Sequence, residues 1–305
     1  MSVQFDHLRH GTPESDWVAG GRLDALARLG LPTRSHPGPG WQLLVVAAHP
    51  DDESLGAGGL IASAAAEDAP VRVVVATNGD ASHPDSPTHS AGRLAEIRRL
   101  EVRAAVAQLD PTAAVTLLDL PDGRLGEHQE ELTDVIAAHL AIAAHLADAQ
   151  PSADAQPSAE AQPSADAQPV LSIDGVGARG ISPTLLVTPW SGDRHPDHEA
   201  CARAGADAID RVSAGTVLAH WQYPIWLWHW AAPDAAEVPW PTMGVFALDL
   251  DARRAKRRAV ACHVSQHEPL SDRPGDEAIL PPRLLEHFTR PFETFMVAAD
   301  LVGTT

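Results

Sequence analysis

The chain carries, at residues 42–66, the segment QLLVVAAHPDDESLGAGGLIASAAA, in which three kinds of sequence follow one another. Gln42 to Ala47 is an apolar run of strand length, and Ser54 to Ala66 is rich in the glycine and alanine that suit a helix packed close to a sheet. Between them lies the polar cluster Ala48-His49-Pro50-Asp51-Asp52-Glu53. This order predicts an α/β unit with a polar turn at the carboxyl end of its strand.

A second polar cluster, Arg194-His195-Pro196-Asp197-His198-Glu199, follows the strand-like run Thr184 to Thr188 in the same way. In an open α/β sheet, ligands bind outside the carboxyl ends of the strands. We therefore expect the two clusters to converge on one site, although they lie far apart in the sequence.

Strand-like and helical patterns alternate along the rest of the chain. The other strand-like runs are Val71 to Thr77, Val115 to Leu118, Val217 to Trp221, Gly244 to Leu248 and Thr294 to Ala298. The helical patterns are Gly92 to Leu109, Glu127 to Ala149, Glu199 to Val212 and Asp251 to Ser265. This alternation predicts parallel strands with right-handed crossovers, in one large α/β domain.

Two segments stand outside the alternation. Residues 1–40 are predicted to form an N-terminal extension, with a helical stretch at Ala19 to Leu29, so that the domain itself covers 41–305. Residues 148–169 repeat the unit Asp/Glu-Ala-Gln-Pro-Ser-Ala and read as a low-complexity Ala/Gln/Pro/Ser linker inserted into the domain. Because regular proline removes backbone donors and the unit has nothing large and apolar to bury, we expect this linker to be extended.

Composition limits the function classes. With 22 Lys and Arg against 41 Asp and Glu, the net charge of −19 disfavours binding to nucleic acid and to anionic membranes. The two cysteines are too few for a disulfide framework, which favours a reducing compartment. The N-terminus has no pattern of a signal peptide and no apolar run is long enough to span a bilayer, so we expect a cytoplasmic protein.

The two clusters contain a set of metal ligands. His49, Asp52 and His198 supply two imidazoles and one carboxylate, which bind zinc and leave a coordination position open for water. Asp51 is then a candidate base that takes a proton from the metal-activated water, and His195 a candidate donor to the developing oxyanion and the leaving amine. Asp197 is expected to orient His195 or a ligand histidine.

Each cluster also has an interpretation that involves no metal. The chain has 16 histidines, and a single histidine is more often a surface or core residue than a ligand. Asp51 and Asp52 also suit the N-terminus of a helix, where carboxylates are favoured. Capping alone does not explain the second cluster, His195 to His198, at another strand end.

At these residues the chain resembles the PIG-L/LmbE family of zinc-dependent N-acetylglucosaminyl deacetylases. The resemblance runs from about Gln42 to Ala298, apart from the linker, and its most specific parts are Ala48 to Glu53 and His195 to His198. It implies a Rossmann-like fold with a doubly wound, mostly parallel sheet flanked by helices. It also implies the roles named above, namely metal ligands at His49, Asp52 and His198, a base at Asp51 and an acid partner at His195.

By matching position, the resemblance implies that Asp80, Arg98 and Asp122 contact substrate hydroxyls. Each has a structural alternative: Arg98 and Glu101 have the spacing of an ordinary i,i+3 ion pair on a helix, and both aspartates adjoin turn residues. The aromatic stretch Trp221 to Trp230 is either a wall on which a sugar stacks or part of the core.

We therefore expect a hydrolase that removes an acetyl or other acyl group from the amine of an N-acetyl amino sugar or a sugar-containing conjugate. The expected cofactor is Zn²⁺, with Fe²⁺ as an alternative, and the expected partner is the small sugar or glycoconjugate substrate, with a homo-oligomer left open. Three rival functions remain: a zinc amidase on a larger acylated natural product or thiol conjugate, a non-haem Fe(II) oxygenase, which uses the same ligand types, and a non-catalytic sugar-binding protein.

Overall fold

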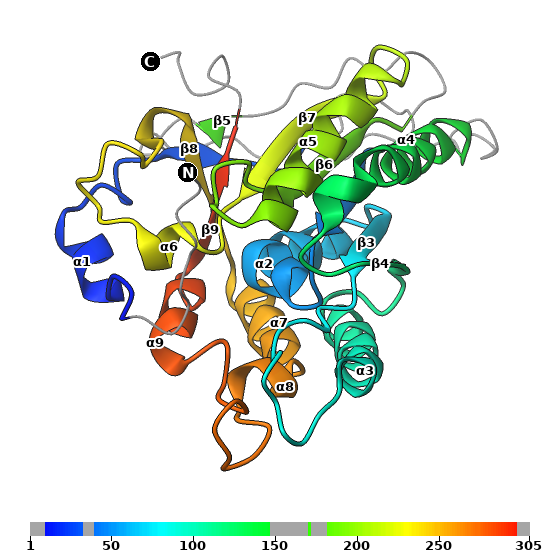
Figure 1. Cartoon of the computed structure of the whole chain (residues 1–305). Coiled ribbons are helices and arrows are strands. Elements are labelled where there is room, and N and C mark those ends of the chain that lie inside the picture. Colours follow the sequence, from blue (N-terminus) through cyan, green and yellow to red (C-terminus); the bar gives the residue numbers. More distant parts are fainter. Residues whose placement is uncertain (1–9, 33–39, 147–169, 172–181, 298–305) are drawn as a thin grey trace.

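The computed structural model describes residues 10–32, 40–146, 170–171 and 182–297, which are built around one mixed β-sheet (Figure 1). Within these residues the sheet has nine strands in the order β4-β3-β2-β6-β7-β9-β8-β1-β5. Their bounds are β1 Ala27–Leu29, β2 Gln42–Ala47, β3 Val71–Thr77, β4 Ala114–Leu120, β5 Val170–Leu171, β6 Thr184–Pro189, β7 Val217–Tyr223, β8 Met243–Ala247 and β9 Phe292–Met296. Neighbouring strands are parallel except at β9, which is antiparallel to both β7 and β8.

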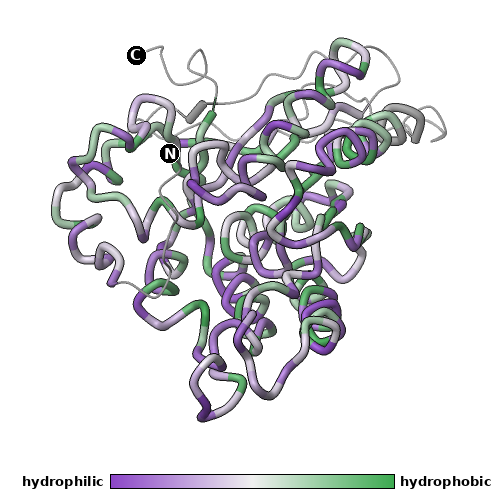
Figure 2. The backbone as a smooth tube through the Cα atoms, in the orientation of Figure 1, coloured by the Kyte–Doolittle hydropathy of each residue, from purple (hydrophilic) through white to green (hydrophobic). Residues whose placement is uncertain are grey.

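Helices cover both faces of this sheet (Figure 1). The longer ones are α2 Asp52–Ala66, α3 Ala91–Leu109, α4 Gln129–Leu146, α5 Pro196–Asp210 and α7 Leu250–Val260, and the shorter ones are α1 Glu14–Ala19, α6 Leu227–Trp230, α8 Val264–His267 and α9 Pro282–Leu285. Short 3₁₀ turns lie at Leu125–His128, Trp240–Thr242 and Glu286–Phe288. Along α3 and α4, hydrophilic and hydrophobic positions alternate (Figure 2), as expected of helices with one face on a sheet.

The two faces of β2 belong to two separate hydrophobic cores. Leu43, Val45 and Ala47 pack with apolar residues of α2, α3 and α7, whereas Leu44 and Val46 pack with residues of α4 and α5. This division follows from the strand geometry, since successive side chains point to opposite faces. A strand buried on both faces has the continuous apolar sequence seen in residues 42–47.

The predicted α/β class with a mostly parallel sheet flanked by helices is confirmed. β2 and β3 have the predicted bounds, and the other predicted strands are present with ends shifted by up to a few residues. The strand β9 is the antiparallel exception in this mostly parallel sheet. The chain enters β9 from residues 268–291, which hold five prolines and single helical turns, so no crossover helix immediately precedes the strand.

Two helix predictions are also wrong. The stretch Ala19 to Leu29 is not a helix: α1 ends at Ala19, before Gly20 and Gly21, and Ala27–Leu29 forms β1. Gly21 has φ of 62°, which turns the chain out of the helix. The pattern from Asp251 to Ser265 is divided into α7 and α8, with a break at residues 261–263.

The order of the strands places the two polar clusters next to each other. From β2 the chain moves outward to β3 and β4, and it then returns to add β6 on the other side of β2. β2 and β6 are therefore the parallel neighbours at which the direction of winding reverses, and ligands bind at such a point.

The division of the chain into an extension at 1–40 and a domain at 41–305 stays a prediction, although β1 pairs with β8 in the common sheet. The linker predicted at 148–169 lies outside the described residues, as do the ends of the helix predicted to reach Ala149 and of the strand predicted to reach Ala298. Of the described helices, none is long and apolar enough to cross a membrane.

Candidate active site

The first cluster forms the turn between β2 and α2. Asp52 is the first residue of α2, and its Oδ2 accepts hydrogen bonds from the backbone N–H groups of Ala48 at 3.1 Å and His49 at 2.9 Å. These bonds close the turn and leave the other carboxylate oxygen facing the second cluster. Asp51 has φ of 135° and ψ of −30°, a conformation that is costly for a residue other than glycine.

The second cluster forms the turn between β6 and α5. His195 is the N-cap residue of α5, and its Nδ1 accepts a hydrogen bond from the N–H of Asp197 at 3.3 Å. His198 lies one turn further into the helix and is fully buried. Its Nδ1 lies 2.7 Å from Oδ2 of Asp193, the buried residue two positions before His195.

Asp52 joins the two clusters. Its Oδ2 lies 3.5 Å from Nδ1 of His49, and its Oδ1 lies 3.4 Å from Nε2 of His198. The rings of His49 and His198 are 5.6 Å apart between centroids, and the His195 ring lies 4.8 Å from the first and 4.6 Å from the second. The structure thus brings together all three predicted metal ligands and His195.

Within the described residues, two groups of three have candidate ligand atoms that all lie within 4.8 Å of one another. One group is His49, His195 and His198, and the other is His49, Asp122 and Asp197. Neither group is the predicted set His49, Asp52 and His198. The hydrogen-bond partners of each side chain show which of its atoms are available to bind a cation.

The hydrogen bonds distinguish the ring nitrogens of His198 from those of His49. Nε2 of His198 is buried and has no hydrogen-bond partner among the described residues, while its Nδ1 lies against Asp193. If Nδ1 carries the proton, Nε2 and the Asp52 oxygen opposite it are both acceptors, and a cation between them satisfies both. In contrast, Nε2 of His49 lies 3.1 Å from carboxylates of both Asp122 and Asp197, contacts that an N–H donor explains without an ion.

The charges around His49 and His198 are strongly negative. Burial alone lowers the pKa of His198, but Asp52 and Asp193 outweigh it and raise the pKa to about 9. Burial is likewise outweighed at His49, whose pKa is raised well above its usual value by Asp122, Asp197 and Asp52. Such a site stabilises positive charge, whether a proton or a metal ion.

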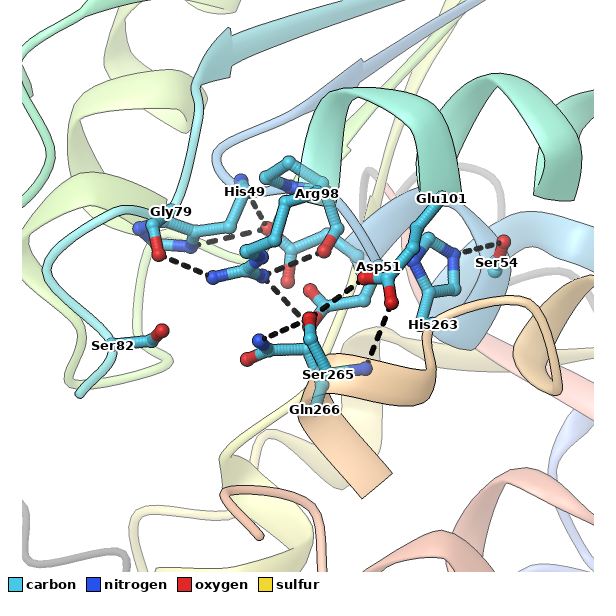
Figure 3. Close-up of polar contacts among 12 residues, drawn as sticks. His49, Asp51, Ser54, Gly79, Ser82, Arg98, Glu101, His263, Ser265 and Gln266 are labelled. Carbon is cyan, nitrogen blue, oxygen red and sulfur yellow. Dashed lines mark hydrogen bonds and ion pairs between the residues drawn. The ribbon is translucent and has the colours of Figure 1, made fainter. Parts of the chain in front are cut away.

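Asp51 is the neighbour of Asp52 in the chain, but its carboxylate contacts Arg98. Its Oδ2 accepts a hydrogen bond from Arg98 at 3.0 Å, as Figure 3 shows, and the residue is only 7% exposed. Burial raises the pKa of Asp51 to about 6, with Arg98 opposing the shift and Asp52 adding to it. A carboxyl with this pKa can accept a proton near neutral pH and release it again.

His195 has the opposite electrostatic surroundings. Burial, followed by the neighbouring His198 and His49, lowers the pKa of His195 to about 3. The ring is therefore neutral at pH 7, and because its Nδ1 accepts from Asp197, its proton is on Nε2. This tautomer can donate a hydrogen bond to an oxyanion.

Asp197, predicted to orient His195 or a ligand histidine, is fully buried and lies against His49. Its carboxylate also accepts from the backbone N–H groups of Gly123 at 2.7 Å and Leu125 at 3.0 Å. Its side chain therefore orients His49, and its backbone N–H orients His195.

The three residues predicted to contact substrate lie in different surroundings. Asp80 is half-buried in a turn after β3. Asp122 accepts from the N–H of Ala81 at 2.8 Å besides facing His49; burial alone would raise its pKa, but His49 outweighs burial and lowers the pKa well below its usual value. Arg98 is buried against Asp51, Pro50 and Gly79, and the alternative ion pair with Glu101 is absent, because Glu101 binds Ser265 instead.

Sequence reasoning missed Asp193, Glu53 and His263 as parts of this site. Asp193 holds His198 and also accepts backbone N–H bonds from residues 225–227 at 2.8 to 3.2 Å. Glu53 and His263 are buried against each other at 3.1 Å. Of these three residues, only Asp193 could have been suspected from the sequence, because an acidic residue two positions before the candidate catalytic His195 is a possible hydrogen-bond partner for a nearby histidine.

The aromatic stretch from Trp221 to Trp230 is mostly core. Trp221, Tyr223, Trp226 and Trp228 are buried, whereas Trp230 is half-buried. The guanidinium of Arg194 lies over the Trp230 ring, 3.7 Å from its centroid. The stretch as a whole is thus not a free surface for stacking.

Comparison with known families gives one match over the site. The family described as PIG-L: GlcNAc-PI de-N-acetylase matches residues 44–209, which is more than half of the 305-residue chain and includes both polar clusters. A curated relative, the 1D-myo-inositol 2-acetamido-2-deoxy-alpha-D-glucopyranoside deacetylase of Nocardioides sp. (strain ATCC BAA-499 / JS614), is 46% identical over 77 residues. That match spans 23% of this chain and 26% of the relative's length.

Several solved structures share the fold. The A40926 pseudoaglycone deacetylase Dbv21 superposes with a TM-score of 0.53 and 19% identity, covering 87% of this chain and 99% of that one. A conserved protein from Thermus thermophilus gives a TM-score of 0.52 and 20% identity, covering 84% of this chain and 94% of that one. At these identities the likeness concerns the fold alone.

Proposed function

This chain belongs to the PIG-L family of de-N-acetylases, hydrolases of a C–N amide bond, and we propose that its substrate is an N-acetyl amino sugar or a conjugate containing one. The family match and the short stretch shared with an inositol-linked glucosamine deacetylase support this substrate class. The single observation that carries the proposal is the convergence of His49, Asp52, His195 and His198 from two turns that lie far apart in the sequence.

The proposed ligands of the metal ion are His49, Asp52 and His198, whose orphaned Nε2 has the chemistry of a metal ligand. A divalent ion such as Zn²⁺ bound there supplies Lewis acidity to the amide carbonyl and makes water more acidic. Asp193 and Asp197 accept from the other ring nitrogens of the two histidines and fix their orientation.

The remaining chemistry belongs to the protein's own side chains. Asp51, with its pKa raised to about 6 mainly by burial, takes a proton from the attacking water and passes it to the nitrogen of the departing amine. His195 donates from Nε2–H to the oxyanion that develops as the carbonyl is attacked. Water thus supplies hydroxyl to the acyl group and a proton to the amine, which balances the hydrolysis.

The test is a measurement of amine and acetate release from a panel of N-acetyl amino sugars and their conjugates. Each substrate is incubated with chelator-treated protein, with and without added Zn²⁺, and N-acetyl amino acids serve as the matched non-sugar amides. We expect release from one or more sugar substrates, loss of release after chelation and recovery with the metal. Release that is confined to the amino acids, or that chelation leaves unchanged, contradicts the proposal.

A further inference from the structure

The strained backbone of Asp51 needs partners that hold it in place. A non-glycine residue with φ of 135° persists only when its surroundings over-determine that conformation. Arg98 supplies one set of contacts, donating to the carbonyl of Pro50 at 2.6 Å and to Oδ2 of Asp51 at 3.0 Å. The N–H of Asp51 has a separate partner, Oε2 of Glu53, at 3.0 Å.

Glu53 is itself fixed by a buried histidine. Its other oxygen, Oε1, accepts from the hydroxyl of Ser54 at 2.6 Å and lies 3.1 Å from Nε2 of His263. Glu53 is fully buried, and His263 is 2% exposed. A buried carboxylate is stable only with partners of this kind, so His263 sets the position of Glu53.

The ring of His263 has its polar contacts on one side. Nε2 also lies 3.1 Å from the Ser54 hydroxyl, as Figure 3 shows, whereas Nδ1 is buried and has no hydrogen-bond partner in the described part of the chain. The hydrogen-bonding capacity of this residue is therefore directed at the start of α2.

Helix α3 contacts both the Asp51 turn and helix α8. Arg98 reaches the Asp51 turn, and Glu101, one turn further along, accepts from the N–H of Ser265 at 2.8 Å and from its hydroxyl at 2.7 Å. Ser265 lies in α8, whose N-cap residue is His263. Figure 3 shows these contacts meeting around Asp51 from α3 and from the α7–α8 break.

We propose that Glu53 and His263 are positioning residues, which hold the Asp51 peptide in its positive-φ conformation and so aim its carboxylate. The effect of these residues on turnover rests on the proposed function, in which Asp51 is the base. Their effect on the backbone conformation of Asp51 does not depend on that function. Through Glu53, this role connects His263, which lies outside the two polar clusters, to the proposed base Asp51.

The kinetic test uses His263→Ala, His263→Gln and Glu53→Ala at saturating Zn²⁺, on the best substrate of the panel. A side chain misplaced by about 1 Å can lower turnover by about 100-fold. We therefore expect kcat to fall by about 10- to 100-fold in both alanine variants with KM changed by less than about threefold. His263→Gln, whose amide can still donate to Glu53, should recover most of the kcat.

His287→Ala is the matched control. His287 is also buried and is also paired with a carboxylate, Glu14 of α1, at 2.5 Å. Its loss removes a similar buried contact between a histidine and a carboxylate and should leave kcat within about twofold of the wild type. Equal losses of kcat in His263→Ala and His287→Ala, without recovery in His263→Gln, would overturn the proposal in favour of a general loss of stability.

A second measurement is independent of the substrate. In crystal structures of Glu53→Ala and His263→Gln, we expect Asp51 to leave its positive φ and lose the Arg98 contact in the first, and to retain both in the second. If the wild type releases no amine from any substrate, the proposed function fails while these structures still decide the positioning role. Asp51 keeping its φ and the 3.0 Å contact in Glu53→Ala overturns the inference.

Discussion

Asp51 has the pKa of a base that works near neutral pH. Because burial raises this pKa to about 6, the active carboxylate form increases as the pH rises through 6 and is lost below it. We therefore predict that kcat/KM falls about tenfold per pH unit below pH 6. A pH–rate profile on one amino-sugar substrate measures this, and a flat profile between pH 5 and 7 contradicts the assignment.

Replacing Asp51 gives the corresponding mutational prediction. Asp51→Asn removes the proton acceptor but keeps the shape of the side chain, so we expect kcat to fall by at least about 100-fold. Because Asp51 is not one of the proposed ligands, zinc content should stay at the wild-type level. Turnover close to the wild type in a zinc-loaded Asp51→Asn protein would exclude this residue as the base.

Asp193 is predicted to strengthen metal binding without touching the ion. Its carboxylate lies 2.7 Å from Nδ1 of His198, and partners of this kind typically affect metal affinity by about 10- to 100-fold. We expect Asp193→Asn to weaken zinc binding by that factor, measured by competition with a chromogenic chelator. Asp134→Asn, which alters an exposed ion pair with Arg211, is the control and should bind zinc as the wild type does.

The sequence predicted that His49, Asp52, His195 and His198 lie close together, and the structure has them so. It could not predict which partner each one contacts. Arg98 reaches Asp51 and not a helical neighbour, because the end of β3 brings α3 across the first turn. His263 reaches Glu53 over 210 positions of sequence, and no local pattern encodes such a contact.

Among the elements, α2 depends on glycine for its close approach to the sheet. A Cβ added at Gly56 would lie 2.1 Å from the ring of Tyr223, whose hydroxyl donates to the carbonyl of Val46 at 2.8 Å. We predict that Gly56→Ala destabilises the protein by about 1–3 kcal/mol, since the buried ring must shift. Thermal unfolding measures this as a lowered Tm.

Gly92 in α3 is the matched control for Gly56. A Cβ at Gly92 meets nothing within 4 Å, and alanine is favoured over glycine in a helix by up to about 1 kcal/mol. Gly92→Ala should therefore leave Tm unchanged or raise it. If the two variants lower Tm equally, close packing at α2 is not what requires Gly56.

β2 and β6 were predictable because each is mostly an apolar run that is followed by a polar turn. β1 was not, since three residues with ordinary side chains acquire strand structure by pairing with β8 and β5. The direction of β9 was not predictable either, because strand direction depends on the path of residues 268–291 rather than on the strand's own sequence.

At the scale of the whole molecule, the repeat at 148–169 offers a test of domain organisation. It lies outside the described residues, and its sequence predicts a linker inserted into the domain. We expect deletion of residues 150–168 to leave turnover and Tm nearly unchanged, because the unit offers no apolar surface to bury. A large loss of either would show that the segment packs against the domain.

The proposed site requires that side chains from two strand ends, distant in sequence, bind one cation together. The fold makes this convergence expected, since β2 and β6 are parallel neighbours at the point where the winding reverses. The sequence predicted the two turns that meet and the contact role of Asp197, whereas it did not predict the buried carboxylate of Asp193 behind His198.

The most direct test is calorimetric titration of metal-free protein with Zn²⁺, for the wild type and for the single variants His49→Ala and His198→Ala. We predict one tightly bound ion per chain in the wild type and loss of tight binding in each variant, because each turn supplies an indispensable ligand. Tight binding of one ion by either variant would contradict a site shared between the two turns.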